Sequence, residues 1–487
     1  NLIGNGDGAS GFTDGVNGDI VGTTSYPIDP LLGLLQDNGG LTETQALQSG
    51  SPAIDAGSNP NNLTTDQRGE ERVQAGSIDI GAYEAPNFNA LTVDNLIDED
   101  DGNLSSGDLS LREALQAVNA GGTIEFSNSL LNQTIALTEG ALVIDKSVTI
   151  NGLGADQLTI DAQGNSRVFT VNDGDNDTFS SVTIDGLTIT GGGRETTGGG
   201  IFNREDLVLQ SSLITGNNIF GGIGGGVFNT RGTVTINDST VSENYAGDTG
   251  GGISNNLGTA IISNSTINSN TAGGPGGGID NDDAMAIISN STISDNVAGN
   301  DGGGSGAGID NSGSATIEIS NSTISGNLIF AGEGGGIDNG NAGSVTVVST
   351  IIAGNIYNST QFSGQPDESD DVDGAFIDGG NNLIGNADNS TGFTTNTTLT
   401  GDSTNLIDPL LGPLQDNGGP TETHALQSGS PAIDAGSNPN NIMTDQRGTS
   451  FARVIDGDGD STATIDIGAY EECFLTGTLI LTDKGNV

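Results

Sequence analysis

The stretch GGGISNNLGTAIISNSTINSN, residues 250–270, is followed by the near-copy GGGIDNDDAMAIISNSTISDN at residues 276–296. The two stretches start 26 residues apart, and the same two motifs, GGGI-x-N and ST-I-x-x-N, recur from residue 198 to residue 355. Each unit holds three short runs in which apolar and polar residues alternate, as in β-strands. A unit of this length with three short strands is typical of one coil of a parallel β-helix rather than of a helical repeat.

Two columns of aliphatic residues follow from this periodicity. Because side chains alternate between the two faces of a strand, Ile and Val are expected to point inward while Ser, Thr and Asp point outward. The first predicted inward column is Ile201, Val227, Ile253, Ile279, Ile309 and Ile337, and the second is Val241, Ile267, Ile293 and Ile324.

Asn recurs at two fixed places in the coil. Asn tolerates the left-handed conformation that a sharp corner requires, and stacked amides can bond to each other along the axis. The sequence therefore predicts two structural ladders, one of Asn203, Asn229, Asn255, Asn281, Asn311 and Asn339, the other of Asn217, Asn244, Asn270, Asn296, Asn327 and Asn355.

The net charge of the chain limits the classes of molecule that it can bind. The chain has 11 Lys and Arg against 63 Asp and Glu, which gives a formal net charge of −52. Nucleic acids and anionic lipids need basic contacts, so neither is expected to bind. Cations such as calcium are favoured instead. No apolar run approaches the roughly 20 residues that span a bilayer, so no membrane insertion is expected in this segment.

A duplication marks the organisation of the chain. Residues 35–62 return almost unchanged at residues 414–441, and each copy ends in DIGAYE. We interpret 1–84 as the closing segment of a preceding module, so that the chain begins inside an array. The further predicted parts are 85–190 (a cap with a short helix near 111–120, then the first coils), 191–381 (regular coils), 382–472 (a second closing segment) and 473–487.

Several motifs resemble known families. The segment LTVDNLIDEDDGNLSSGDLSLREALQAVNA, residues 91–120, resembles the CSLREA domain of bacterial surface proteins, with Leu109 in place of the family's Cys. The coils are similar to the right-handed parallel β-helix repeats that follow that domain. The order NNLIG, DPLLG, LQDNGG, SPAIDAG, DQRG and DIGAYE resembles the choice-of-anchor Q domain found at the end of such helices, notably in cyanobacteria. This resemblance implies an all-β, right-handed parallel β-helix at the cell surface or outside the cell.

The last residues, CFLTGTLILTDKGNV, resemble the opening of a Hint (hedgehog/intein-type) domain. In that family the leading Cys thiol attacks the preceding carbonyl, which would make Cys473 a self-processing residue. The alternative is a strand that begins with Cys and has no chemical role. The reaction would in any case require the rest of a Hint domain.

Two acidic clusters are candidate calcium sites. Asp456, Asp458 and Asp460 alternate with Gly as in the first half of a calcium loop, and Asp173, Asp175 and Asp177 form a similar run. Neither completes the full loop pattern, and Asp and Gly also favour ordinary turns. Calcium is therefore one of two readings for each cluster, and no other cofactor is predicted.

The coils also carry recurring Asp residues. Asp280, Asp282, Asp283, Asp310 and Asp338 repeat at the coil period, and we interpret them as a solvated acidic face because basic partners are scarce. Arg68 and Arg447 in the two DQRG motifs are expected to form structural ion pairs with nearby Asp residues. His424 replaces Gln45 of the other copy, so the module is not expected to depend on it.

These observations predict a non-enzymatic structural repeat of a large extracellular protein. It would pack head to tail with copies of itself into a surface fibre, filament or sheath. A calcium-dependent adhesin or carbohydrate-binding surface module, bound to cell-surface polysaccharide, is the alternative. A polysaccharide lyase or hydrolase ranks last because the coils carry so few basic residues.

Overall fold

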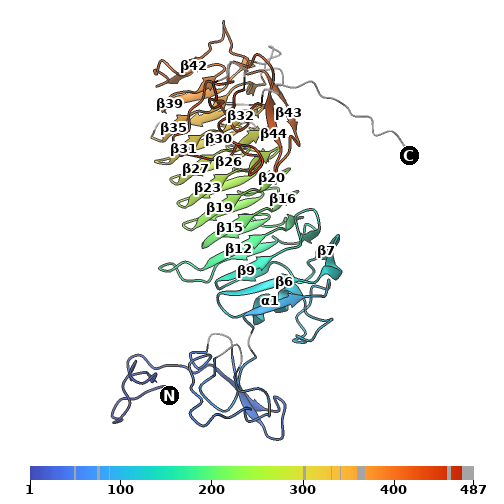
Figure 1. Ribbon diagram of the computed structural model, residues 1–487, viewed down its shortest axis with the longest axis vertical. Coiled ribbons are helices and arrows are strands. Elements are labelled where there is room, and N and C mark those ends of the chain that lie inside the picture. Colours follow the sequence, from blue (N-terminus) through green and yellow to red (C-terminus); the bar gives the residue numbers. More distant parts are fainter. Residues whose placement is uncertain are drawn as a thin grey trace, which may run out of the picture.

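The chain folds into a parallel β-helix, which confirms the predicted fold class (Figure 1). The computed structural model describes residues 1–487 except 49–50, 74–76, 87, 300–302, 331, 341, 359–367, 458–461 and 474–487. Equivalent residues of successive coils pair in parallel, as in the register Ile201↔Val227, Val227↔Ile253 and Ile253↔Ile279. These partners are 26 residues apart, so the sequence period is the length of one turn.

The strands of successive coils form four stacks. The first contains β8 (Leu142–Ile144), β11 (Phe169–Val171), β14 (Ile201–Asn203), β18 (Val227–Thr230), β22 (Ile253–Asn256), β26 (Ile279–Asp282), β30 (Ile309–Ser312), β34 (Ile337–Asn339), β39 (Val372–Asp378) and β41 (Ser390–Thr391). The second contains β5 (Ala90–Val93), β6 (Gly122–Phe126), β9 (Val148–Asn151), β12 (Ser181–Asp185), β15 (Asp206–Gln210), β19 (Thr233–Asn237), β23 (Thr259–Ser263), β27 (Met285–Ser289), β31 (Thr316–Ser320) and β35 (Ser344–Val348), and it also pairs with the end of β39.

The other two stacks close the coil. The third contains β7 (Gln133–Ala136), β10 (Leu158–Asp161), β13 (Thr188–Thr190), β16 (Leu213–Thr215), β20 (Thr240–Ser242), β24 (Thr266–Asn268), β28 (Thr292–Ser294), β32 (Thr323–Ser325), β36 (Ile351–Ile352), β40 (Leu383–Ile384) and β42 (Leu399–Thr400). The fourth contains β17 (Asn218–Ile219), β21 (Tyr245–Ala246), β25 (Thr271–Ala272), β29 (Val297–Ala298), β33 (Leu328–Ile329), β37 (Ile356–Tyr357) and β38 (Glu368–Ser369).

The interior is filled by the two predicted aliphatic columns. Every member of both columns is fully buried, the first column in the first stack and the second column in the third stack. Small side chains from the fourth stack, such as Ala246 and Ala272, face the same interior at 0% exposure. Stacking like residues on like residues gives each coil the same cross-section, so the core continues without interruption along the axis.

The Asn residues of both predicted ladders lie inside the solenoid and bond from coil to coil. In one ladder, Asn244 Nδ2 donates to Asn270 Oδ1 (2.9 Å) and Asn270 Nδ2 donates to Asn296 Oδ1 (3.0 Å). In the other, Asn229 Nδ2 donates to Asn255 Oδ1 (2.8 Å). A column of buried Ser hydroxyls, which the sequence analysis missed, accepts backbone N–H bonds in the same way, for example Ser265 Oγ from Ser239 (3.2 Å).

The left-handed corner residue is not the ladder Asn, as was expected. In the ladder through Asn229 it comes two residues after the Asn, as at Arg231 (66°), and in the ladder through Asn244 it is the residue before the Asn. Glu243, Ser269 and Asp295 have φ of 55°, 57° and 56°. The ladder Asn that follows turns its amide inward to bond with the next coil, so the preceding residue makes the corner. Gly occupies this corner position at Gly216 and Gly326, where it adopts the conformation without steric cost.

A short helix closes the N-terminal end of the solenoid. The predicted helix near 111–120 is α1 (Leu111–Ala117), and a 3-10 turn, η1 (Asn128–Leu130), follows it. Ser110 and Glu113 form a capping box that starts the helix, and its apolar side is buried against the first coils. Arg112 Nε donates to Asp98 Oδ1 (2.7 Å), which ties the helix to the preceding loop.

The two copies of the duplicated segment fold alike. The first has the parallel pair β1 (Leu2–Ile3) and β2 (Ile20–Val21), then the hairpin β3 (Leu32–Gln36) and β4 (Thr44–Leu47). The second uses β40 and β42, then the hairpin β43 (Leu411–Gln415) and β44 (Thr423–Leu426). The second copy lies along the third stack, whereas the first lies beyond the capped end of the solenoid (Figure 1).

Substitution of one ladder residue should destabilise the whole solenoid. Asn296→Ala removes the acceptor of the Asn270 N–H and the donor to the Ile267 carbonyl, leaving both backbone groups buried without these partners. We expect a loss of about 3 kcal/mol in the free energy of unfolding, measured from the urea midpoint. Asn218→Ala is the control, because that side chain is exposed and bonds only within its own turn. Equal effects of both substitutions would contradict a stabilising role of the ladder.

Candidate functional site

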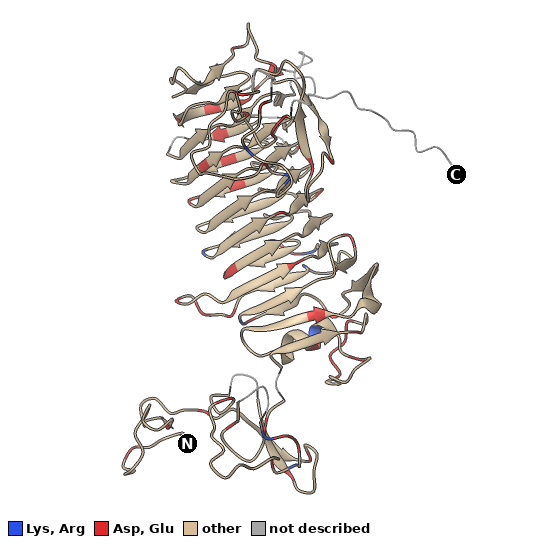
Figure 2. Ribbon diagram, viewed as in Figure 1, with Lys and Arg blue, Asp and Glu red and all other residues tan. Residues whose placement is uncertain are grey.

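The outward side of the first stack changes from aromatic to acidic along the axis. One row of side chains in register runs from Phe202 and Phe228 through Ser254. It continues as Asp280, Asp310, Asp338 and Asp373, one on each of four successive rungs. Acidic residues gather on this part of the solenoid in Figure 2. We call these four residues the carboxylate row.

Two members of the carboxylate row are buried, which corrects the expectation of a solvated acidic face. Asp280 is 6% exposed and Asp310 is 3% exposed. Hydroxyl groups of the corner loops cover them: Asp280 Oδ2 accepts from Thr249 Oγ1 of the preceding coil (2.7 Å), and Asp310 accepts from the hydroxyl of Ser305. Asp338 and Asp373 are only partly covered, so solvent reaches the row from its C-terminal end.

Burial and mutual repulsion keep protons on the carboxylate row. Desolvation raises the pKa of Asp280 to about 7 and that of Asp338 to about 7, and the charge of Asp310 adds to both shifts. Desolvation also raises the pKa of Asp310 and of Asp373. None of the ion pairs formed by the described residues includes a member of the row, so no cation offsets these effects.

The row therefore places protonated and ionised carboxyl groups side by side. In the strand register Asp338 lies between Asp310 and Asp373, and the charges of both neighbours raise its pKa further. Adjacent like-charged groups cannot all ionise, so one holds a proton at a pH where its neighbour has lost its own. Such a set contains a proton donor and a proton acceptor, which are the two groups that acid–base hydrolysis requires.

A hollow of about 650 Å³ opens on the corner that carries these loops. The corner is continuous, because Asp248 N donates to Gly222 O (3.0 Å) and Gly274 N donates to Asp248 O (2.7 Å). Arg194 and Phe220 line the hollow, and Phe220 is 85% exposed. The rings of Phe220 and Tyr245 are 5.6 Å apart, so the corner presents an aromatic surface to solvent.

The predicted calcium residues Asp173, Asp175 and Asp177 lie together in one turn, and calcium binding stays a prediction. Asp173 Oδ1 and Asp175 Oδ1 accept backbone N–H bonds from within their own turn (2.8 and 2.9 Å), and Asp177 lies exposed on the same turn. Asp456 belongs to the second copy, while Asp458 and Asp460 lie outside the described residues. Among the residues that the structure describes, no group of three or more His, Cys, Asp or Glu side chains is arranged to hold a metal.

Cys473 is exposed, and the residues after it lie outside the described part of the chain. Its predicted self-processing role therefore stays a prediction. In the described ranges, no helix is both long enough and apolar enough to cross a membrane.

The two DQRG arginines form the expected type of ion pair. Arg68 pairs with Asp66 (2.8 Å) and Arg447 pairs with Asp445 (2.5 Å), and each guanidinium also covers a Tyr ring. His424, on which the module was not expected to depend, is buried. Its Nε2 lies 2.9 Å from Ser294 Oγ on the solenoid.

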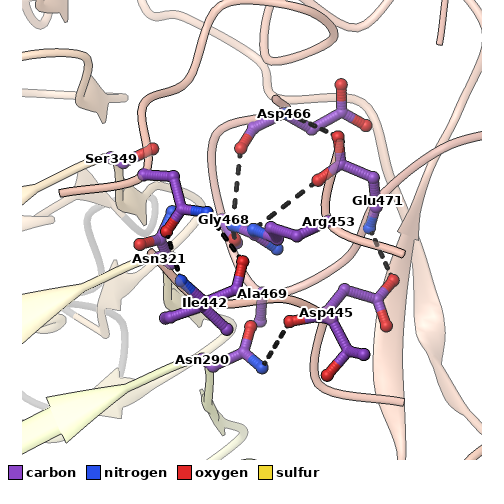
Figure 3. A network of polar contacts seen from close by, with 12 residues as sticks. Asn290, Asn321, Ser349, Ile442, Asp445, Arg453, Asp466, Gly468, Ala469 and Glu471 are labelled. Atoms are coloured by element: carbon purple, nitrogen blue, oxygen red, sulfur yellow. Dashed lines mark hydrogen bonds and ion pairs between the residues drawn. The ribbon is translucent and has the colours of Figure 1, made fainter. Parts of the chain in front are cut away.

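A second and more deeply buried arginine, which was not predicted from the sequence, lies in the C-terminal copy. Arg453 is fully buried, lies 3.6 Å from Glu471 and donates to the Gly468 carbonyl, at the centre of the network in Figure 3. Desolvation raises the pKa of Glu471 to about 9, and the charge of Arg453 opposes that shift. The corresponding pair in the first copy is Arg72 with Glu84. Because Arg72 and Arg453 each follow a DQRG motif, this repetition in the sequence could have identified the pair.

Comparison with known proteins gives one match of fold. No family model matches the sequence, and a comparison with curated proteins gives no match either. Among solved structures, the crystal structure of pectate lyase Pel9A is similar, with 17% sequence identity and a TM-score of 0.48. The match covers 79% of this chain and 96% of that one. The resemblances to the CSLREA, choice-of-anchor Q and Hint families therefore stay predictions.

This comparison corrects two predictions. The sequence analysis expected a non-enzymatic fibre-forming repeat and ranked a polysaccharide lyase or hydrolase last, whereas the matching structure is that of an enzyme, a pectate lyase. The scarcity of basic residues was the physical reason for that ranking. The likeness concerns the path of the chain alone, so an activity has to be argued from this chain's own side chains.

Stability should fall as the pH rises because of the carboxylate row. A carboxyl group whose pKa is raised on folding stabilises the native state fully below its unfolded pKa of about 4. That contribution is lost as the pH rises through about 7, the pKa of Asp280 and Asp338 in the fold. We expect Asp280→Asn to raise the melting temperature at pH 8 and to leave it nearly unchanged at pH 4.

Asp283→Asn is the matched control for this measurement. Asp283 is one of the Asp residues of the same coil, but it is fully exposed and hydrogen bonds from Ser314 lower its pKa. Its substitution should not increase the melting temperature at pH 8. If both variants gained stability equally, the effect would come from net charge and not from the carboxylate row.

Proposed function

We propose that this chain hydrolyses a polysaccharide by acid–base chemistry at the open end of the carboxylate row. The observation that carries the proposal is the strand register that places Asp338 between Asp310 and Asp373, where desolvation and their charges raise its pKa to about 7. Functional sites are where burial and like charges shift pKa values in this way. Asp338 and Asp373 are also the two members that solvent reaches.

The proposed step uses one carboxyl group of each kind. Asp338, protonated, donates its proton to the glycosidic oxygen as the bond between that oxygen and the anomeric carbon breaks. Ionised Asp373 attacks the anomeric carbon and forms a glycosyl ester, because carboxyl groups on adjacent rungs lie too close together for a water molecule to enter between them. Water then hydrolyses the ester, and Asp338, which has become ionised, takes the proton that the water loses. The products are two shorter chains, and the pair returns to its starting state. Asp310 acts as a positioning residue, since its buried charge favours the protonated form of Asp338.

Charge and shape favour an uncharged polysaccharide. The ionised members of the carboxylate row have no cationic partner among the described ion pairs and would repel a polyuronate, so the pectate-like substrate class is disfavoured. The exposed ring of Phe220 offers a stacking platform for a sugar on the same continuous corner, toward the N-terminal end. An extended chain lying along the axis would contact both places.

Two substitutions should separate chemistry from binding. Asp338→Asn removes the proton donor, so we expect kcat to fall by about 100-fold or more. Phe220→Ala removes the stacking surface and should raise KM by several fold while kcat changes little. The measurement is release of reducing ends from a panel of neutral polysaccharides, with polygalacturonate as the acidic comparison. The rate should also decline above pH 7, where Asp338 loses its proton.

Asp283→Asn serves again as the control, because this exposed carboxylate lies outside the row and should leave both constants unchanged. The proposal fails if no neutral polysaccharide is cleaved, or if Asp338→Asn retains full activity on one that is.

A further inference from the structure

The two copies of the duplicated segment carry the same internal contacts. Ser51 Oγ donates to Pro30 O (2.6 Å), as Ser430 Oγ does to Pro409 O (2.6 Å). Both hairpins have the same irregularity, between Leu32 and Leu35 in one and at the equivalent place in the other. Left-handed residues also recur in pairs, as at Leu31 and Leu410 (49° and 50°), Asp55 and Asp434 (55° and 55°), and Asn62 and Asn441 (52° and 53°).

One face of the second copy contacts the solenoid. Gln446 Nε2 donates to Thr266 Oγ1 (2.9 Å), and Thr292 Oγ1 donates to Gln446 Oε1 (2.6 Å), so one amide spans two rungs of the third stack. Ala469 N donates to Thr323 Oγ1 (3.1 Å). Beside these bonds, an apolar cluster joins Ile351 and Ala353 of the solenoid to the copy's Leu383, Leu426, Ala432 and Ile467.

The same face is exposed in the first copy. Gln67, the counterpart of Gln446, is exposed, whereas Gln446 is fully buried. Gln67 keeps only the internal bonds, to Thr42 Oγ1 (2.9 Å) and Glu43 O (3.3 Å), which Gln446 also makes to the equivalent atoms. Ala82 is likewise exposed, whereas its counterpart Ala469 is 1% exposed.

The first copy has a hollow lined by the counterparts of residues that contact Ile351 and Ala353 of the solenoid in the second copy. It measures about 660 Å³, and its lining includes Leu2, Leu32, Leu47, Ala53, Ile80 and Ala82. Four of these are the counterparts of Leu383, Leu426, Ala432 and Ile467, which close around Ile351 and Ala353 in the second copy. Three leucines of the bare hairpin, Leu32, Leu34 and Leu35, are 43%, 80% and 62% exposed.

Strand pairing points the same way. In the second copy, β40 pairs with β42 on one side and with the solenoid strand β36 on the other. Within the described part of the chain, β1 pairs with β2 alone, so its other edge is open. An open parallel edge beside exposed apolar residues is a template on which a further strand can pair.

We infer that residues 1–84 form a docking module for the C-terminal end of a parallel β-helix other than the solenoid of this chain. The occupant is a coil that offers a β36-like edge strand with Ile and Ala at the places of Ile351 and Ala353, flanked by rungs with Thr hydroxyls like those of Thr266 and Thr292. This chain's own solenoid is not available, because residues 382–472 already cover that end and flank. The inference is independent of the proposed hydrolysis.

A graft within the chain tests this inference. Residues 1–84 are placed where residues 382–471 stand, so that the solenoid is closed by the first copy's sequence. We expect the graft to restore the melting temperature of the intact chain to within about 5 °C, well above that of a chain ending at residue 381. A graft that melts no higher than the uncovered chain would overturn the inference.

A charged residue introduced on this exposed face tests whether the face itself contacts the solenoid. Ala82→Arg in the grafted copy should remove the gain, because the equivalent Ala469 is buried against Thr323. The same substitution in the original first copy of the intact chain is the control and should change nothing, since Ala82 is exposed there. If the intact chain dimerises in sedimentation and Ala82→Arg abolishes the dimer, the surface belongs to a second copy instead.

Discussion

Parallel stacking of coils in register is the constraint on which this molecule depends. In a parallel β-helix each residue lies above its counterpart in the preceding coil, so a polar group buried in one coil must be satisfied by the same group in the next. The Asn ladders meet this requirement with side-chain bonds of 2.7–3.0 Å between coils. The ladder through Asn355 ends on the buried carboxylate of Asp371, which accepts the last amide bond (2.9 Å).

The same constraint creates the carboxylate row. Register that is useful for apolar and amide side chains also places Asp above Asp, where the charges repel each other and burial removes the solvent that would screen them. Elsewhere on the solenoid a neutral side chain occupies the equivalent position, as Ser254 and Phe228 do in the preceding coils. Four successive rungs carry Asp in spite of this electrostatic cost. Such a concentration of carboxyl groups with shifted pKa values is typical of functional sites.

The sequence predicts the parts of the structure that depend on period and misses those that depend on loops. The aliphatic columns, the coil length and the helix Leu111–Ala117 follow from spacing alone, because those residues meet partners at a fixed separation. Burial of Asp280 and Asp310 does not follow, since it depends on how Thr249 and Ser305 in the corner loops fold over the strand. The left-handed corners were assigned to the ladder Asn residues but lie at neighbouring positions for a related reason: the tendency of Asn toward that conformation is weaker here than the buried bonds its side chain makes.

The duplicated segment shows most directly what a sequence leaves undetermined. Arg72 and Glu84 lie 3.7 Å apart in the first copy, and Arg453 and Glu471 lie 3.6 Å apart in the second. Desolvation raises the pKa of Glu84 to about 7 but that of Glu471 to about 9. The ion pair is the same in both copies, but Arg453 is fully buried in the second copy whereas Arg72 is partly exposed in the first. A sequence repeated almost letter for letter therefore specifies the fold of the module and the face it can bury. Whether that face is buried depends on a neighbouring coil, which lies outside the module itself.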